Sequence, residues 1–168
     1  MPRIVVCLAI ANLILLLMTA AMGLGASRPS LDRHVLLAVV TLMVSCGIQV
    51  VVFTYFTITG KMIGQAVHLG GLDTAPLAAV ESSKKSASRL VGLVMVGVVF
   101  ATATGAAQWR ADARGTMHFA AAGLLVLVHA LAFYREYDLV WANARLMDDV
   151  LRQYRARRTT PSAGDGPA

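Results

Sequence analysis

Three polar side chains that are costly to place in lipid occur inside long apolar runs of this sequence: Asn12, Gln49 and His129. Each must find a hydrogen-bonding partner in hydrocarbon, so an intramembrane polar residue is a functional hypothesis by default. Counting about 1.5 Å per residue along each run puts all three at one depth, about 10 Å inside the apolar layer. We interpret this intramembrane polar layer as an interhelical clamp, with a ligand pocket or part of a proton path as the alternatives.

Two further histidines, His34 and His118, lie at the starts of apolar runs and so at one level on the opposite side of that layer. Histidines with carboxylates such as Asp32 and Asp112 can bind zinc or another transition metal, and a pair of histidines can ligate a haem. The sequence has no tight local motif such as HxxxH. We therefore expect no cofactor, and keep haem or metal at His34 and His118 as an alternative.

The sequence predicts no catalytic residues. It has no CxxC pair, no acidic metal cluster in the apolar runs and no Ser-His-Asp set. The segment TITGKMIG has the Gly-Lys pair of a phosphate-binding loop, but Tyr55 and Met62 stand where that pattern requires glycine and serine or threonine. Cys7 and Cys46 are too few for a disulfide framework, and we interpret them as small packing residues.

Four apolar runs must position these polar residues. The chain has 168 residues, of which 57% are hydrophobic and 14% charged, against about 25% charged in an average soluble domain. A hydrocarbon core requires about 20 apolar residues per helix, and the runs cover residues 4–24, 35–58, 90–107 and 117–134. The sequence thus predicts an all-α fold, an integral membrane four-helix bundle, with no second domain.

The first run also has features of a signal peptide, with Arg3 before it and Leu24-Gly25-Ala26 after it. Its apolar stretch covers about 21 residues, whereas the apolar core of a signal peptide has about 7–15. We therefore expect a retained helix, with cleavage as the alternative.

Basic residues gather on one side of the predicted spans, which bears on orientation. The positive-inside rule places the more basic side in the cytoplasm, so we expect a bacterial inner-membrane protein with both termini in the cytoplasm. Anionic lipid headgroups are the expected neighbours of these charges. The eleven residues on that side are Arg3, Lys61, Lys84, Lys85, Arg89, Arg135, Arg145, Arg152, Arg155, Arg157 and Arg158, and the four on the other side are Arg28, Arg33, Arg110 and Arg114.

Three of the helices are expected to extend beyond the membrane on the cytoplasmic side, over residues 60–69, 75–89 and 135–158. The rhythm of apolar residues continues helically past Gly60, and Gly70-Gly71 is a plausible stop. Asp73 or Thr74 can cap the next helix. The polar section ESSKKSAS within 75–89 could instead form a loop. Residues 159–168, TTPSAGDGPA, are expected to be a disordered tail.

The last helix is predicted to present one continuous inward stripe. At 100° per residue, His118 and His129 fall within about 20° of each other, and Glu136 shares their face. Leu127 and Leu131 lie on the opposite face, which becomes charged at Arg145 and Arg152. We interpret the end of the inward stripe as a docking surface for a partner, formed by Val140, Met147, Leu151 and Tyr154.

Small residues recur at helix-packing spacing in the third and fourth runs. Ala101 is four residues from Gly105, and the segment 120–123 forms a smooth patch. Small residues let helix backbones approach closely in lipid. We therefore expect these two helices to pack tightly, or the same surfaces to form a homodimer.

The end of the second run, from Phe53 to Lys61, resembles a Tyr-Phe-x-Gly-Thr-Gly segment followed by arginine or lysine in a group of uncharacterised bacterial four-span inner-membrane proteins. Tyr55, Phe56 and Gly60 carry the resemblance, which covers about ten residues and the layout of the spans. The chain departs from that pattern at Ile58 and at 62–63, where a tryptophan is usual. The resemblance implies no activity.

These observations favour a non-enzymatic integral membrane protein that serves as an accessory, assembly or scaffold subunit. Its expected partners are the lipid bilayer and a protein partner or a second copy of itself. Nucleic acid is not expected, because no recognition module accompanies the basic residues. The alternatives are a small transporter or channel that uses the polar layer, and a redox subunit with b-type haem or metal.

Overall fold

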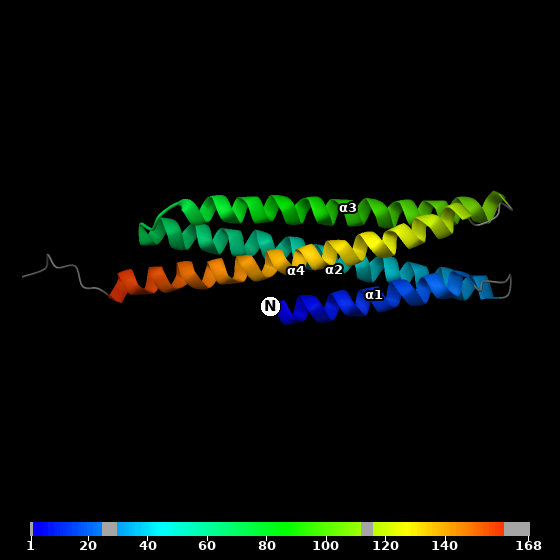
Figure 1. Cartoon of the computed structure of the whole chain (residues 1–168), viewed down its shortest axis with the longest axis horizontal. Coiled ribbons are helices and arrows are strands. Elements are labelled where there is room, and N and C mark those ends of the chain that lie inside the picture. Colours follow the sequence, from blue (N-terminus) through cyan, green and yellow to red (C-terminus); the bar gives the residue numbers. More distant parts are fainter. Residues whose placement is uncertain (1, 25–29, 112–115, 160–168) are drawn as a thin grey trace, which may run out of the picture.

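The computed structural model describes residues 2–24, 30–111 and 116–159, and all but a short turn of this part of the chain is helical. The helices are α1 (Pro2–Leu24), α2 (Leu31–Gly70), α3 (Ala75–Ala111) and α4 (Thr116–Thr159), and they lie side by side in alternating directions (Figure 1). The predicted all-α four-helix bundle is confirmed. Each helix is long and apolar enough to cross a membrane. The predicted disordered tail 159–168 is wrong at Thr159, which is the last residue of α4, and residues 160–168 lie outside the described part.

The helices differ in length, and this divides the bundle into two halves. α1 has 23 residues and α4 has 44, which correspond to about 35 Å and 66 Å. α1 accompanies α2 and α4 only as far as Val5, which packs in one cluster with Phe56 and Val140. Up to that level the bundle is the four-helix half. Beyond it, residues 57–86 and 141–159 of α2, α3 and α4 form the three-helix half (Figure 1).

The predicted helical extensions of α2 and α3 are present, so the polar section of 75–89 is helical and not a loop. α2 continues through Gly60 and Gly64 without a break. At Gly60 the two helices approach closely, because a Cβ atom there would lie only 3.1 Å from Cγ1 of Val80. The absence of a side chain at this position therefore sets the spacing between α2 and α3.

The turn between α2 and α3 has the geometry expected of a glycine stop. Gly71 has a left-handed φ of 54°, a conformation that glycine adopts at little cost. The Leu72 N–H donates to the Val67 carbonyl at 3.0 Å, and the Ala75 N–H donates to Asp73 Oδ1 at 3.2 Å. Arg157 near the end of α4 donates to the Gly71 carbonyl at 2.6 Å. The far end of α4 is thus fastened to the turn.

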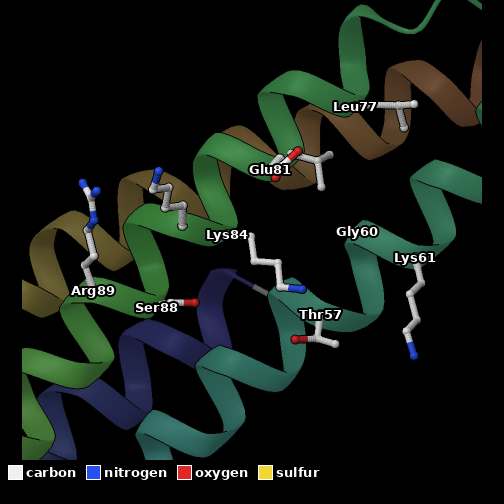
Figure 2. A pocket seen from close by; sticks show the side chains of 10 residues that line it. Thr57, Gly60, Lys61, Leu77, Glu81, Lys84, Ser88 and Arg89 are labelled. Atoms are coloured by element: carbon white, nitrogen blue, oxygen red, sulfur yellow. The ribbon is translucent and has the colours of Figure 1, made fainter.

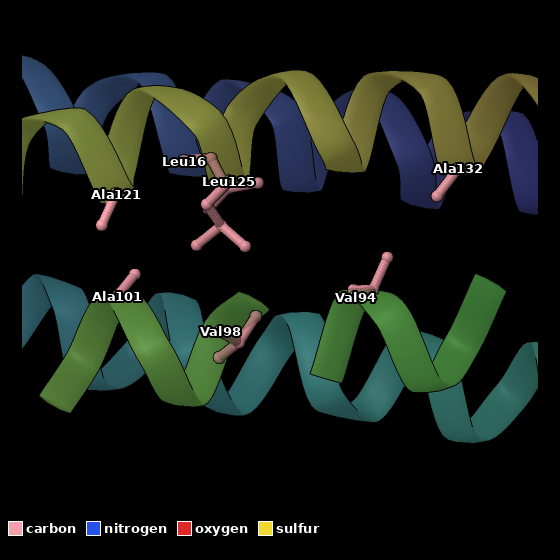
Figure 3. Packing of buried hydrophobic residues seen from close by; sticks show 7 residues of the cluster. All are labelled: Leu16, Val94, Val98, Ala101, Ala121, Leu125 and Ala132. Carbon is pink, nitrogen blue, oxygen red and sulfur yellow. The ribbon is translucent and has the colours of Figure 1, made fainter. Parts of the chain in front are cut away.

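The four-helix half has small side chains between α3 and α4. Ala101 and Ala121 are buried there and face each other across the interface (Figure 3). A Cβ atom at Gly97 would lie 3.0 Å from Leu125 Cδ1. The predicted close packing of these helices is confirmed at Ala101, whereas Ala120 is exposed. The rest of the cluster is aliphatic: Leu16, Val94, Val98, Leu125 and Ala132.

The three-helix half has its own apolar core, around Ile63, Val67, Val80 and Val150. The residues predicted to dock a partner contribute to the interior of the bundle. Val140 is fully buried beside Phe56, and the other three pack against the core of the three-helix half. α2 and α3 of the same chain therefore cover this stripe, whose members are Val140, Met147, Leu151 and Tyr154.

Candidate functional site

A column of buried polar side chains runs along the inner faces of α1, α2 and α4. No member is more than 4% exposed, and such burial is costly for polar groups unless they are hydrogen-bonded. We call this set the polar column. Its members are Asn12, Thr41, Ser45, Gln49, Thr59, His129, Glu136 and Asn143.

The relative heights of these residues follow from one hydrogen bond. Asn143 Nδ2 of α4 donates to Thr59 Oγ1 of α2 at 2.7 Å, and α2 and α4 run in the same direction (Figure 1). A residue of α4 is therefore at the same height along the bundle axis as the residue of α2 whose number is lower by 84. Ser45 is then level with His129, and Glu136 is three residues, about 4.5 Å, beyond Gln49 in the direction of the three-helix half.

Hydrogen bonds between side chains join different helices along the column. Ser45 donates to Asn12 Oδ1 at 2.8 Å and links α2 to α1. The hydroxyls of Thr41 and Thr19 lie 2.7 Å apart and make a second link between these helices. Together with the bond between Asn143 and Thr59, these contacts tie α2 to both of its polar neighbours. They limit how far α1 and α4 can slide along α2.

Five members of the column keep polar atoms without a hydrogen-bond partner within the described residues, and two of these atoms are Asn12 Nδ2 and Asn143 Oδ1. Both amide atoms of Gln49 and both carboxyl oxygens of Glu136 are buried and unpartnered. The Gln49 amide lies beside the Glu136 carboxyl without the geometry of a hydrogen bond. His129 Nδ1 contacts the Leu125 carbonyl at 3.0 Å, whereas its Nε2 has no partner. His129 and Glu136 could accept or release a proton, and the side chains of Gln49, His129 and Glu136 could each bond a buried water.

The sequence places the column by simple periodicity. On α4, His129, Glu136 and Asn143 are spaced by seven residues, which returns a helix to nearly the same face after two turns. On α2, Ser45 and Gln49 are spaced by four, the interval between successive turns. The polar residues of each helix therefore lie on one face of that helix, and this face is turned to the interior of the bundle.

The predicted polar layer is present as buried residues but is spread over more than one level. Asn12, Gln49 and His129 are each fully buried. Asn12 bonds to Ser45 at the level of His129, and Gln49 lies one turn away, about 6 Å along the axis. Ser45 was not predicted as a member, because a serine in an apolar run is inconspicuous. Its spacing of four from Gln49 and Thr41 was the available signal.

The structure brings His34 and His118 together, with ring centroids 6.2 Å apart in an edge-to-face arrangement. Each ring packs on a glycine of the preceding helix. A Cβ atom at Gly23 would lie 2.9 Å from His34 Cε1, and one at Gly105 would lie 2.9 Å from His118 Cε1. The two histidines thus occupy matching positions in the hairpins α1–α2 and α3–α4.

The two histidines pack on glycines of neighbouring helices. Two histidines alone are fewer ligands than a structural metal site uses. His118 Nδ1 contacts the Ala101 carbonyl at 3.2 Å. A structural zinc site takes four protein ligands, and no group of three or more candidate ligands occurs within the described ranges. Asp112 lies outside them. Asp32 is exposed.

Comparison of the chain with protein-family models, with curated proteins and with solved structures finds no match. The function is therefore inferred from the polar column, the two halves of the bundle and the distribution of charge.

Proposed function

We propose that the chain is a non-enzymatic membrane protein of a bacterial inner membrane that serves as an accessory, assembly or scaffold subunit. One observation carries this proposal. A bundle with an apolar exterior continues without a joint into a three-helix rod with an apolar core and a charged exterior. Such a molecule is suited to hold a folded element at a fixed distance from a membrane.

The distribution of basic residues supports an orientation with the three-helix half in the cytoplasm. Lys61, Lys84 and Lys85 belong to that half, and cytoplasmic segments next to spans are enriched in lysine and arginine. Both termini are then cytoplasmic. The part of α4 beyond Val140 would extend about 28 Å from the inner membrane surface.

The hydrogen bonds of the polar column support a structural role for the four-helix half. Each interhelical bond in lipid contributes about 0.6–2 kcal/mol. In the four-helix half, the bonds of Ser45 to Asn12 and of Thr41 to Thr19 oppose sliding of α1 along α2. Where the three-helix half begins, the bond of Asn143 to Thr59 does the same for α4 and α2. A bundle locked in this way positions the cytoplasmic rod rigidly, which is what a scaffold requires.

Site-specific photo-crosslinking in native membranes tests the scaffold role. A photoreactive side chain at Leu69, which is 78% exposed in the three-helix half, should give one discrete protein adduct. The same probe at Leu36, exposed in the four-helix half, is the matched control for lipid contact. Purification in mild detergent should retain the partner or show a self-oligomer. A monomer without adducts from exposed positions around the rod contradicts the proposal.

The unpartnered atoms of Gln49, His129 and Glu136 favour a second candidate function, proton movement through the bundle. Buried ionisable groups in spans mark proton relays in pumps and transporters. Purified protein in vesicles with a pH gradient should then dissipate the gradient, and Glu136→Gln and His129→Leu should abolish this flux. The Ser45→Ala variant controls for damage to the bundle. Flux equal to that of protein-free vesicles excludes this function.

A further inference from the structure

A groove between α2 and α3 gathers positive charge at the start of the three-helix half. It encloses about 780 Å³ and is lined by Thr57, Gly60 and Lys61 of α2 and by Lys84, Ser88 and Arg89 of α3, among others. We call it the cationic groove. Figure 2 shows Lys84 and Ser88 directed into the space between the two helices, whereas Lys61 and Arg89 extend away from it.

The helix contacts explain why a hollow forms at this position. Gly60 and Val80 bring the two helices close together at one end of the groove. Toward the four-helix half the facing residues are Thr57 and Ser88, which are too small to fill the interface. Lys84 extends from α3 toward Thr57, and Ser88 points into the same space (Figure 2). A flexible ammonium group and a hydroxyl group therefore face one opening.

The cations of the groove are not neutralised by the protein. The lining includes four basic side chains and one carboxylate, that of Glu81, so its formal net charge is +3. The ion pair between Arg152 and Asp149 is the only one within the described ranges, and it lies elsewhere on α4. Ser88 likewise has no hydrogen-bond partner in this part of the chain. The groove thus offers unused donors for an anion.

The position of the groove along the bundle indicates where such an anion would come from. Thr57 lies at the end of the apolar run 35–58, and Arg89 immediately precedes the apolar run 90–107. Both helices therefore leave the hydrocarbon layer at the level of the groove. This is the depth of phospholipid headgroups, and basic pockets between spans on the cytoplasmic side are suited to anionic ones.

We propose that the cationic groove binds the phosphate of an anionic phospholipid, such as phosphatidylglycerol, from the cytoplasmic leaflet. Lys84 contacts the phosphate oxygens as a point charge, and the Ser88 hydroxyl donates a hydrogen bond to one of them. Lys61, on the rim of the groove, adds attraction through its charge. The acyl chains lie against the apolar exterior of α2 and α3. The inference rests on the proposed orientation, but not on the existence of a protein partner.

Lipid binding to the purified full-length protein in detergent tests this proposal. The titrants are fluorescent phosphatidylglycerol and, for comparison, fluorescent phosphatidylcholine of the same chain length. We expect preference for the anionic lipid, a loss of roughly fivefold in affinity for Lys84→Gln and a smaller loss for Lys61→Gln. The matched control, Arg155→Gln, removes the same charge from exposed surface near the end of α4 and should have little effect.

A second variant tests the shape of the groove without changing its charge. Ser88→Leu fills the hollow and leaves every cation in place, so it should weaken binding of the anionic lipid about as much as Lys84→Gln. Lys84→Arg keeps the charge and should retain most of the affinity. The unfolding midpoint of each variant shows whether the bundle is intact, and the lysine substitutions decide the question if Ser88→Leu is unstable.

Three results would overturn the proposal. An equal loss for Arg155→Gln and Lys84→Gln would mean that diffuse surface charge, not the groove, attracts the lipid. Full affinity in an intact Ser88→Leu variant would mean the same. Displacement of the lipid by an excess of inorganic phosphate or glycerol phosphate would assign the groove to a soluble phosphate compound. None of these results depends on whether a protein partner is found.

Discussion

The two halves of this bundle are built in opposite ways. In the four-helix half the exterior is apolar, as at Leu131, which is 69% exposed, whereas His129 and Glu136 are fully buried. In the three-helix half Val150 is buried, and the exterior of the same helix carries an exposed ion pair between Asp149 and Arg152. One uninterrupted helix, α4, changes from the first pattern to the second.

This reversal fits the surroundings that we propose for each half. An apolar exterior minimises free energy in lipid, where polar groups must be satisfied internally. A charged exterior with an apolar core minimises it in water. Buried hydrogen bonds between side chains occur in both halves, between Ser45 and Asn12 in the four-helix half and between Asn143 and Thr59 near the start of the three-helix half.

The largest expected effect comes from placing a charge in the core of the three-helix half. Val150→Asp buries an unpaired carboxylate, and we expect a loss of about 3 kcal/mol or more of stability in that half. Limited proteolysis in detergent should then cleave within 141–159 much faster than in the natural protein. Gln153→Asp introduces the same charge at an exposed position and should leave cleavage unchanged. Equal resistance of both variants to proteolysis would contradict an apolar core in the three-helix half.

A charge on the exterior of the four-helix half should affect insertion more than folding. Leu131→Arg places a cation on the lipid side of α4 near the end of the run 117–134, where the cost is lower than the value of about 2.5–3.5 kcal/mol for a charge at the middle of a span. We expect a smaller membrane-inserted fraction in an insertion assay. The reverse change farther along the same helix, Arg145→Leu, should insert normally. Normal insertion of Leu131→Arg would argue that this face does not contact lipid.

A double-mutant cycle on Asn12 and Ser45 measures the polar clamp. If the bond between them stabilises the bundle, the coupling energy from Asn12→Ala, Ser45→Ala and the double variant should be about 0.6–2 kcal/mol. Unfolding of the detergent-solubilised protein by a denaturing detergent provides the measurement. Thr54→Ala, at an exposed position on α2, controls for loss of a hydroxyl group. Additive effects would show that the bond does not act as a clamp.

The smallest expected effect concerns the end of α4. Arg157→Gln removes the hydrogen bonds to the Gly70 and Gly71 carbonyls, and exposed contacts of this kind contribute about 1 kcal/mol or less. Faster amide hydrogen exchange around residues 68–72 should report the loss. Arg155→Gln should not change it. Unaltered exchange in Arg157→Gln would mean that the turn holds its shape alone.

The sequence was sufficient for the parts of the fold that depend on local periodicity. The four apolar runs, the glycine stop at Gly71 and the inward face of α4 follow from composition and helical spacing, and the structure agrees with each. The helical state of 75–89 was one of two alternatives. Beyond its first turn the segment contains no residue that ends a helix, but its polar composition is also compatible with a loop.

The partners of individual side chains could not be predicted, because they depend on the register between helices. A count of residues from an interface is uncertain by about one turn, which is the distance between Gln49 and the level of Asn12. The stripe ending at Tyr154 was assigned to a partner although extensions of the second and third helices were predicted, because the sequence does not show that these extensions pack against it. The cationic groove combines residues of two helices and has no signature in either.

The central claim, that one helix passes from lipid into cytoplasmic water, is tested most directly by cysteine labelling along the exposed face of α4. With Cys7 and Cys46 replaced by alanine, single Leu131→Cys and Arg152→Cys variants are treated with a membrane-impermeant maleimide. The account predicts no labelling of Leu131→Cys from either side of the membrane, and rapid labelling of Arg152→Cys in inside-out vesicles but not in intact cells. Equal labelling of the two variants, or labelling of Arg152→Cys in intact cells, would contradict it.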